Sequence, residues 1–319
     1  MAKWAGVSDK RKQKAARRAA RKHAARKKQL GRAYRDASGR THLVVHRDPL
    51  GNVQGLTLAA PLFRERWQNE VATGAANTSH GMFAGGPSLE AAVALGQSAM
   101  EGTSTIVDGV LARAADGQRL ACQLGCAHCC YQPVGVTAPE VFAIHDHLRA
   151  RLSPDALAAV AERVHAADAS ARGKSAAERL SPELPCPFLQ QDRCSIYEVR
   201  PLACRGKNSL DAEACERTLH DPSERAALLA GQRSVPCFLE PIRAFHAVSA
   251  GLQLALHELY HLRVAPLDLT AAMRVLLDDP EGVPERWLRG EDPFQAARGA
   301  DVTGDPLIRE LSGSRSARG

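Results

Sequence analysis

The spacing of apolar and polar positions predicts a chain that is mostly helical beyond residue 88. Ser88-Leu-Glu-Ala has the form of a capped helix start, and apolar positions follow it with helical spacing towards Ala115. Ser153-Pro154-Asp155 supplies a second start, with proline in the first turn. The same periodicity predicts further helices over 139–152, 153–171, 239–262 and 267–277, and an amphipathic closing segment over 287–294.

The region before residue 88 carries a weaker pattern. Two short apolar runs, His42–His46 and Val53–Leu58, flank a segment that contains Asp, Pro and Gly, which favours a hairpin. Residues 72–87 are rich in Gly, Asn, Thr and Ser, and this composition predicts a loop. We therefore interpret residues 41–87 as a linker that contains a short hairpin.

Charge divides the chain sharply. Residues 1–40 hold 15 of the 42 basic residues and 2 of the 35 acidic ones, so this segment carries +13 and the remainder −6. The apolar positions of its repeat are alanine, which is too small for a core or for deep membrane insertion. We expect residues 1–40 to be a disordered basic tail that contacts nucleic acid or another anionic surface. A solubility tail, or a misassigned start codon, is the equal alternative.

Composition and cysteine content narrow the class of protein. Aromatic residues make up only 4%, while Ala, Leu and Arg are abundant, which favours helices over a β-sandwich or barrel. No apolar run is long enough to predict a transmembrane segment, and no apolar stretch near Met1 resembles a secretory signal, so we expect a cytoplasmic protein. Nine cysteines in that compartment are expected to be reduced, and their clustering indicates metal or redox chemistry.

The first cysteine cluster has the spacing of a metal site. Cys126 and Cys129 form a Cys-x-x-Cys pair, with which one tight turn presents two sulfurs to one ion. Gly125 permits a sharp turn beside a ligand, and Cys122 adds a third thiol. Side chains of neighbouring residues are expected to diverge, so Cys130 should not share an ion equally with Cys129. That geometry indicates a second metal, a bridging thiolate or a polynuclear cluster.

A second cluster extends from Cys186 to Cys215. Prolines on both sides of Cys186 stiffen the backbone there. Four thiolates on a divalent ion leave a charge of about −2, and Arg200 and Arg205 are placed to offset it as donors behind the ligands. Whether His128 or Cys237 also binds stays open. The predicted metal ligands are Cys122, Cys126, Cys129, Cys130, Cys186, Cys194, Cys204 and Cys215.

A metal site built from both cysteine clusters requires that the clusters meet in space. The two helices predicted between residues 139 and 171 would form a hairpin that returns the chain. The expected fold class is mainly α, with helices that frame an irregular cysteine-rich metal-binding centre in a domain over 88–295, followed by a frayed tail over 296–319. Thiolate ligands suit zinc and iron, including an iron–sulfur cluster.

These cysteine motifs resemble the YkgJ-type cysteine-cluster family, a CxxCxxCC zinc- or iron-chelating domain. The resemblance rests on Cys122…Cys126-Ala-His-Cys129-Cys130, Cys186-Pro-Phe-Leu, Cys194-Ser-Ile-Tyr-Glu-Val-Arg-Pro-Leu-Ala-Cys204-Arg205 and Asn208-Ser-Leu-Asp211…Ala214-Cys215. The first gap holds three residues, where the family name implies two. The resemblance implies metal chelation, and one relative, the flagellin lysine N-methylase, implies that such a domain can serve methyl transfer.

Three functional hypotheses therefore stand: a metal-binding protein, an iron–sulfur enzyme related to protein lysine N-methylases, and a thiol redox sensor that uses the Cys126/Cys129 dithiol. The alternative to all three is that the cysteines are buried as small apolar residues and have only a packing role. His257-Glu258-Leu-Tyr-His261 matches the HExxH pattern of zinc proteases. The leucines around it favour an ordinary packed helix instead.

Overall fold

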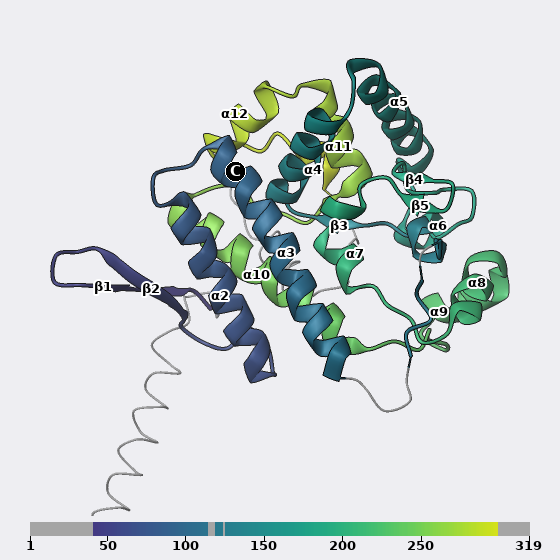
Figure 1. Cartoon of the computed structure of the whole chain (residues 1–319), viewed down its shortest axis with the longest axis horizontal. Coiled ribbons are helices and arrows are strands. Elements are labelled where there is room, and N and C mark those ends of the chain that lie inside the picture. The colour runs from purple at the N-terminus through teal and green to yellow at the C-terminus, as the bar shows by residue number, and fades with distance from the viewer. Residues whose placement is uncertain (1–40, 114–118, 124, 299–319) are drawn as a thin grey trace, which may run out of the picture. The chain divides into compact units, whose positions relative to one another are not determined.

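The structure is a computed structural model that describes residues 41–113, 119–123 and 125–298 (Figure 1). The predicted basic tail over 1–40 and most of the predicted C-terminal tail lie outside these residues. The chain divides into two units, Met1–Arg64 and Glu65–Gly319.

The first unit contains the predicted hairpin. Strand β1 (Leu43–Arg47) pairs antiparallel with β2 (Val53–Leu58). The Asp48 carboxylate holds the turn, because it accepts hydrogen bonds from the backbone N–H and the side-chain amide of Asn52 at 2.9 and 3.0 Å. Gly51 has a φ of 88°, a backbone conformation that favours glycine. The hairpin prediction is confirmed.

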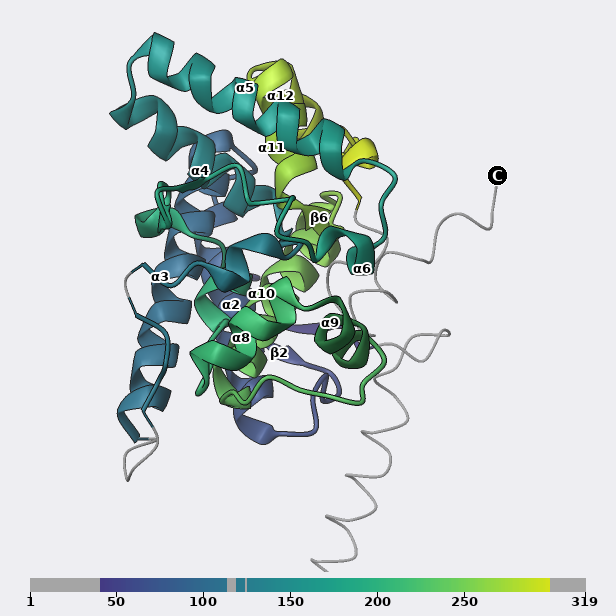
Figure 2. The same ribbon diagram turned by 90° about the vertical axis from the view of Figure 1, so that its right-hand side faces the viewer.

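The second unit is mainly helical, as predicted. Figures 1 and 2 show its longer helices crossing one another around a shared interior, with the short elements gathered at one side. The helices that frame this interior are α2 (Arg66–Phe83), α3 (Leu89–Arg113), α4 (Ala138–Arg151), α5 (Pro154–Ala171), α10 (Leu239–Tyr260), α11 (Leu269–Asp278) and the short α12 (Gly282–Leu288).

Several of the shorter elements carry cysteines. The short helices are α6 (Ala176–Arg179), α7 (Leu202–Gly206), α8 (Ala212–His220) and α9 (Pro222–Leu229). Single 3₁₀ turns occur at η1 (His128–Tyr131), η2 (Tyr197–Val199) and η3 (Gln295–Ala297). Two-residue strands pair antiparallel as β3 (Gly135–Val136) with β6 (Leu267–Asp268), and β4 (Leu189–Gln190) with β5 (Arg193–Cys194).

Helix α2 occupies much of the segment that was predicted to be a loop, so that prediction is wrong. Its polar residues are compatible with a helix because their side chains bond to the backbone one turn earlier: Thr73 to Asn69 at 2.8 Å, and Ser79 to Ala75 at 2.8 Å. Its small residues are explained by close packing against α10. A Cβ added to Gly251 on α10 would lie 2.0 Å from the carbonyl oxygen of Ala72.

A second close approach joins α3 to α4. A Cβ on Gly96 would lie 2.2 Å from the carbonyl oxygen of Pro139, at the start of α4. Behind this contact, the Phe142 ring packs edge-on against Trp287, with centroids 5.3 Å apart, and lies 5.9 Å from Phe294. These rings are buried. They fix the N-terminal end of α4, from which the cysteine segments are positioned.

The return of the chain after α4 differs from a simple helical hairpin. Helices α4 and α5 both pack against α11. Buried Asp168 on α5 pairs with Arg274 on α11 at 2.9 Å and also with Arg172. The chain is therefore reversed by docking on a third helix, and it runs on towards the second cysteine cluster.

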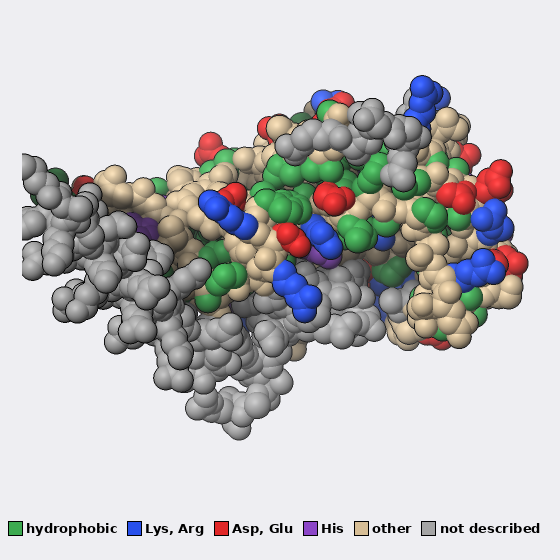
Figure 3. All heavy atoms as spheres, turned by 90° about the horizontal axis from the view of Figure 1, so that it is seen from below, with side chains coloured by type: hydrophobic (Ala, Val, Ile, Leu, Met, Phe, Trp, Pro, Cys, Tyr) green, Lys and Arg blue, Asp and Glu red, His purple; other side chains and the backbone are tan. Residues whose placement is uncertain are grey.

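Acidic and basic side chains are interspersed on the face that Figure 3 shows, among hydrophobic ones. The described residues of that face therefore carry no extended field of a single sign. Within the described residues, no helix combines the length and the apolar character needed to cross a membrane.

Candidate metal centre

The first cysteine segment is tied to the polypeptide just before α8. The N–H of Ala121 donates to the carbonyl of Ser209 at 2.9 Å, and the N–H of Ser209 donates to the Cys122 sulfur at 3.2 Å. Gly125 turns the chain with a φ of 91°, as its position beside Cys126 predicts. Cys122 and Ser209 are therefore in contact although they lie 87 positions apart in the sequence.

The second cysteine segment meets the first at Cys130. The N–H of Cys186 donates to the Cys130 carbonyl at 2.8 Å. From there a tight β-ribbon places Cys194 opposite Leu189. The two clusters thus lie together, as predicted, although they are separated by α4 and α5.

Cys204 is positioned by a buried carboxylate. Glu140 is 1% exposed, and its Oε1 accepts the N–H of Leu202 at 2.8 Å, at the start of α7. Its Oε2 accepts from the N–H and the hydroxyl of Thr137 at 2.8 and 2.9 Å, which completes a capping box for α4. Burial raises the pKa of Glu140, and these donors partly oppose the shift. One side chain therefore caps α4 and holds the helix that carries Cys204.

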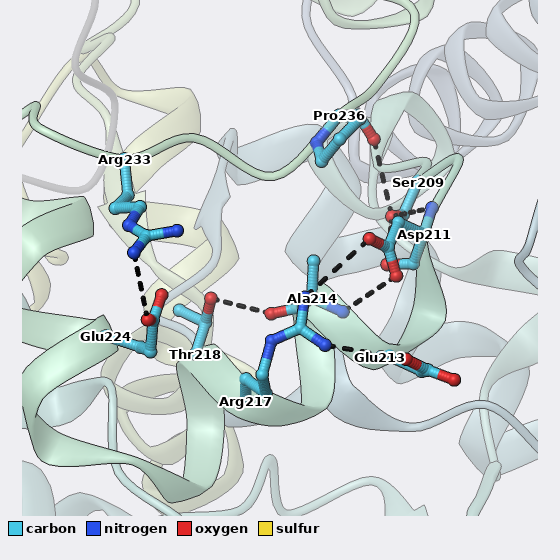
Figure 4. Close-up of polar contacts among 9 residues, drawn as sticks. All are labelled: Ser209, Asp211, Glu213, Ala214, Arg217, Thr218, Glu224, Arg233 and Pro236. Atoms are coloured by element: carbon cyan, nitrogen blue, oxygen red, sulfur yellow. Dashed lines mark hydrogen bonds and ion pairs between the residues drawn. The ribbon is translucent and has the colours of Figure 1, made fainter.

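Cys215 is presented by α8, whose start is capped by Asp211. The Asp211 carboxylate accepts the N–H of Ala214 at 2.9 Å (Figure 4). Arg217 approaches Asp211 and Glu213 at 3.8 and 3.5 Å (Figure 4). The Ser209 hydroxyl donates to the Asp211 carbonyl at 2.8 Å, so the turn that contacts Cys122 also leads into the cap of the helix that carries Cys215.

One set of thiols gathers at this turn. Burial raises the pKa of Cys122, and Cys126, Cys129 and Cys215 raise it further by their charge. Burial also raises the pKa of Cys215, where Cys126 and Cys129 contribute in the same direction. These sulfurs are therefore close enough to influence one another. We name Cys122, Cys126 and Cys215 the α8 set.

A second set gathers at the β-ribbon and α7. Burial raises the pKa of Cys186 to about 12, and it raises that of Cys204 well above its ordinary value. Cys186, Cys194 and Cys129 all add to the shift of Cys204. We name Cys130, Cys186, Cys194 and Cys204 the ribbon set. Cys129 interacts with both sets.

The expectation that the Cys129 and Cys130 side chains diverge is wrong. Each sulfur lies close enough to the other to shift its pKa: Cys130 lowers the pKa of Cys129, and Cys129 raises that of Cys130. The two residues lie in the 3₁₀ turn η1. Only one of the pair ionises easily, because one proton is shared between two sulfurs.

The thiols are gathered without forming a finished coordination shell. Among the residues that the structure describes, no three Cys, His, Asp or Glu side chains are arranged to hold a metal ion. This includes the HExxH pattern, since α10 ends at Tyr260 and His261 is a left-handed cap with a φ of 55°. His128 begins η1 and is half-buried. A metal would therefore have to draw the sulfurs together.

The boundaries of this arrangement coincide with those of a known domain. Residues 121–221 match the CxxCxxCC family, and we call these residues the CxxCxxCC segment. The family model is described as "Putative zinc- or iron-chelating domain". The matched segment begins one residue before Cys122 and ends at the cap of α9, so it contains all eight predicted ligands and excludes Cys237. The match supports a metal-binding, cysteine-rich protein. No curated protein and no solved structure matches the chain.

Arg205 of the CxxCxxCC segment acts mainly on the backbone. It is 9% exposed, and its guanidinium donates to the carbonyls of Arg200 at 2.9 Å and Glu198 at 2.5 Å, and to the Ser104 hydroxyl. These bonds fix the turn between Cys194 and Cys204. The Arg205 charge also lowers the pKa of Cys194, against the larger effect of burial.

Arg200 faces the thiols directly. Its charge lowers the pKa of Cys129, Cys194 and Cys204, in each case by less than burial raises it. The guanidinium lies 4.6 Å from the centre of the Tyr197 ring. Its Nε is buried without a hydrogen-bond partner among the described residues. A buried donor of this kind requires an acceptor.

The CxxCxxCC segment therefore fits a thiophilic metal by the chemistry of its donors. Its sulfurs are soft ligands suited to zinc and iron. The unpaired Nε of Arg200 fits an anionic thiolate or sulfide nearby, because a metal-bound sulfur keeps its negative charge.

Sequence reasoning missed several residues of this site. Lys207 lowers the pKa of Cys129 by more than Arg200 does. Its position three residues after Cys204 was the available signal. Glu140 and Ser209 were missed because their roles depend on contacts across 62 and 87 residues. The Asn208–Asp211 stretch had been noted only as part of a family resemblance.

Proposed function

We propose that the CxxCxxCC segment binds zinc or iron through cysteine thiolates. The observation that carries this proposal is the mutual electrostatic influence of thiols from separate segments, gathered within the residues that match a zinc- or iron-chelating family.

The ligands are drawn from the α8 set and the ribbon set, with Cys129 between them. Arg200 supplies positive charge to the ribbon set, and Lys207 supplies it to Cys129. Arg205 positions the turn that presents Cys194 and Cys204. A thiolate-bound zinc would supply cross-links between segments, whereas an iron–sulfur cluster would supply one-electron chemistry.

Metal content is the first test. Protein purified without oxygen is analysed for zinc, iron and acid-labile sulfide, and its absorption spectrum is recorded. Stoichiometric zinc in a colourless protein supports a structural metal site. Iron and sulfide in a brown protein support an iron–sulfur centre, with the lysine N-methylase relationship as the reaction to examine next. Protein without stoichiometric metal contradicts the proposal.

The assignment of ligands is tested by paired substitutions. Cys126→Ser with Cys215→Ser removes two members of the α8 set, and Cys186→Ser with Cys204→Ser removes two members of the ribbon set. Each pair should lower the metal content. Cys237→Ser is the matched control, because this half-buried cysteine lies outside the matched residues. The assignment would be contradicted if Cys237→Ser lowered the metal content and neither double substitution did.

A thiol redox sensor is the second candidate function, favoured by the exposed Cys129 thiol and its pKa of about 6. Such a thiol is largely ionised at neutral pH and reacts readily with electrophiles. Alkylation of the protein as purified, with sites located by mass spectrometry, distinguishes the two. Rapid labelling of Cys129 supports the sensor, whereas protection that is lost on chelation supports the metal centre.

A further inference from the structure

A cavity of about 300 Å³ lies beside the ribbon set. Its walls come from one face of α5, from the proline-rich segment before Cys186 and from the first turn of α11. Cys186 itself forms part of the wall. This volume is at the lower end of the range for cavities that hold small organic molecules.

The cavity contains one cation that no acid of the described residues neutralises. The Arg163 guanidinium donates only to neutral carbonyl groups, those of Ala159 at 3.1 Å and Pro187 at 3.4 Å. Arg179 lines the same cavity, but it pairs with Asp268 at 2.7 Å. Glu183 lines the cavity too, but its side chain is exposed, so solvent screens its charge.

The remaining N–H groups of Arg163 can bind an oxyanion in a two-pronged geometry. The surrounding wall is largely apolar, with Ala167, Leu184 and Leu269 among its members. An apolar wall with one convergent polar group suits a molecule that has a charged head and a short hydrocarbon body. Inorganic phosphate or sulfate satisfies the first requirement alone.

We propose that this cavity binds a small organic carboxylate, with its carboxyl group on Arg163 and its apolar body against α5 and the start of α11. The bound molecule lies beside Cys186, at the edge of the thiol cluster. The inference stands on the cavity and on Arg163, and it does not depend on whether the cluster holds a metal.

Butyrate is the probe, with butylamine and inorganic phosphate as comparisons. Binding to the purified full-length protein is followed by saturation-transfer NMR and calorimetry. Butyrate should bind saturably in the millimolar range, and butylamine and phosphate should bind at least tenfold more weakly. Arg163→Gln should weaken butyrate binding by about tenfold or more, because a charge-assisted contact is lost. Arg149→Gln, an exposed arginine on α4, should leave binding unchanged.

A second variant locates the site independently of charge. Ala167→Phe fills the cavity and should abolish butyrate binding while the thermal unfolding midpoint stays close to that of the parent. The proposal is overturned if butyrate fails to bind, if Arg163→Gln and Arg149→Gln bind it equally, if phosphate binds as well as butyrate, or if folded Ala167→Phe still binds. None of these results bears on metal content, so this inference and the proposed function fail separately.

Discussion

Glu140 accepts the backbone N–H of Leu202 across 62 residues of sequence, at 2.8 Å. The same carboxylate caps α4 through Thr137, so the framework helix and the helix that carries Cys204 share one anchor. Because the side chain is 1% exposed, water cannot replace any of these bonds. The cysteine centre is therefore attached to the hydrophobic core by a polar contact.

Replacement of this anchor should be costly even when the shape is kept. Glu140→Gln retains an acceptor for Leu202, but its amide group faces the two donors of Thr137 and cannot accept from them. We expect a loss of about 2 kcal/mol in the free energy of unfolding. Chemical denaturation measures it, and Glu162→Gln on the exposed face of α5 is the matched control. Equal stability of the two variants would contradict the anchoring role.

The pH dependence of this anchor has a defined sign. Burial raises the pKa of Glu140 in the folded protein above its unfolded value. Its contribution to stability is then complete below the unfolded pKa and is lost as the pH rises through the folded pKa. The stability advantage of the parent over Glu140→Gln should therefore shrink as the pH rises through that interval. Denaturation of both proteins across a pH series checks this, and an advantage that grows with pH would refute it.

The contact between α2 and α10 predicts opposite effects for two glycines. Gly251→Ala would place a methyl group 2.0 Å from the Ala72 carbonyl oxygen, so the helices must separate. We expect a loss of about 3 kcal/mol, near the upper end for overpacking. Gly74→Ala on α2 meets nothing within 4 Å and should stabilise the helix by about 0.5–1 kcal/mol. Thermal and chemical unfolding compare the two, and destabilisation of equal size in both would contradict this packing.

The sequence predicts those elements whose signals are local. The hairpin, α3, α4, α5, α10 and α11 follow from caps, periodicity and turn residues, and the structure confirms them. Helix α2 was not predicted because its Gly, Ser, Thr and Asn residues are typical of a loop. They are explained only by the structure, in which α10 packs closely against α2 at Ala72. Composition alone cannot reveal that packing.

In the candidate site, too, some features have a signal in the local sequence and others depend on the folded structure. The cysteine spacing predicted that the two cysteine segments meet, and the hydrogen bond from the Cys186 N–H to the Cys130 carbonyl joins them. It could not predict that Cys129 and Cys130 converge, which depends on side-chain rotamers within η1. Nor could it separate Arg205, which holds backbone carbonyls, from Arg200, which faces the thiols, since both arginines lie within four residues of Cys204.

The different roles of the arginines lead to a prediction about affinity. Arg200→Gln removes positive charge that faces Cys129, Cys194 and Cys204. Metal affinity should fall by about 10-fold to 100-fold, as is usual when a group behind the ligands is lost. Arg193→Gln, an exposed arginine beside Cys194 in sequence, should change it little. Competition with a chromophoric chelator measures both, and equal losses would show that the position of the charge does not matter.

Metal loading should release protons and strengthen as the pH rises. Burial raises the pKa of Cys186 to about 12 and that of Cys204 well above its ordinary value, so both are thiols at neutral pH. A metal binds the thiolate, and each such ligand must lose its proton on binding. Apparent affinity should therefore increase steadily from about pH 6 to about pH 8. Calorimetry in two buffers of different ionisation enthalpy counts the protons released. The count should fall when Cys186 and Cys204 are both replaced by serine, and it should stay unchanged in Cys237→Ser. Affinity that is independent of pH would mean that these two thiols do not bind the metal.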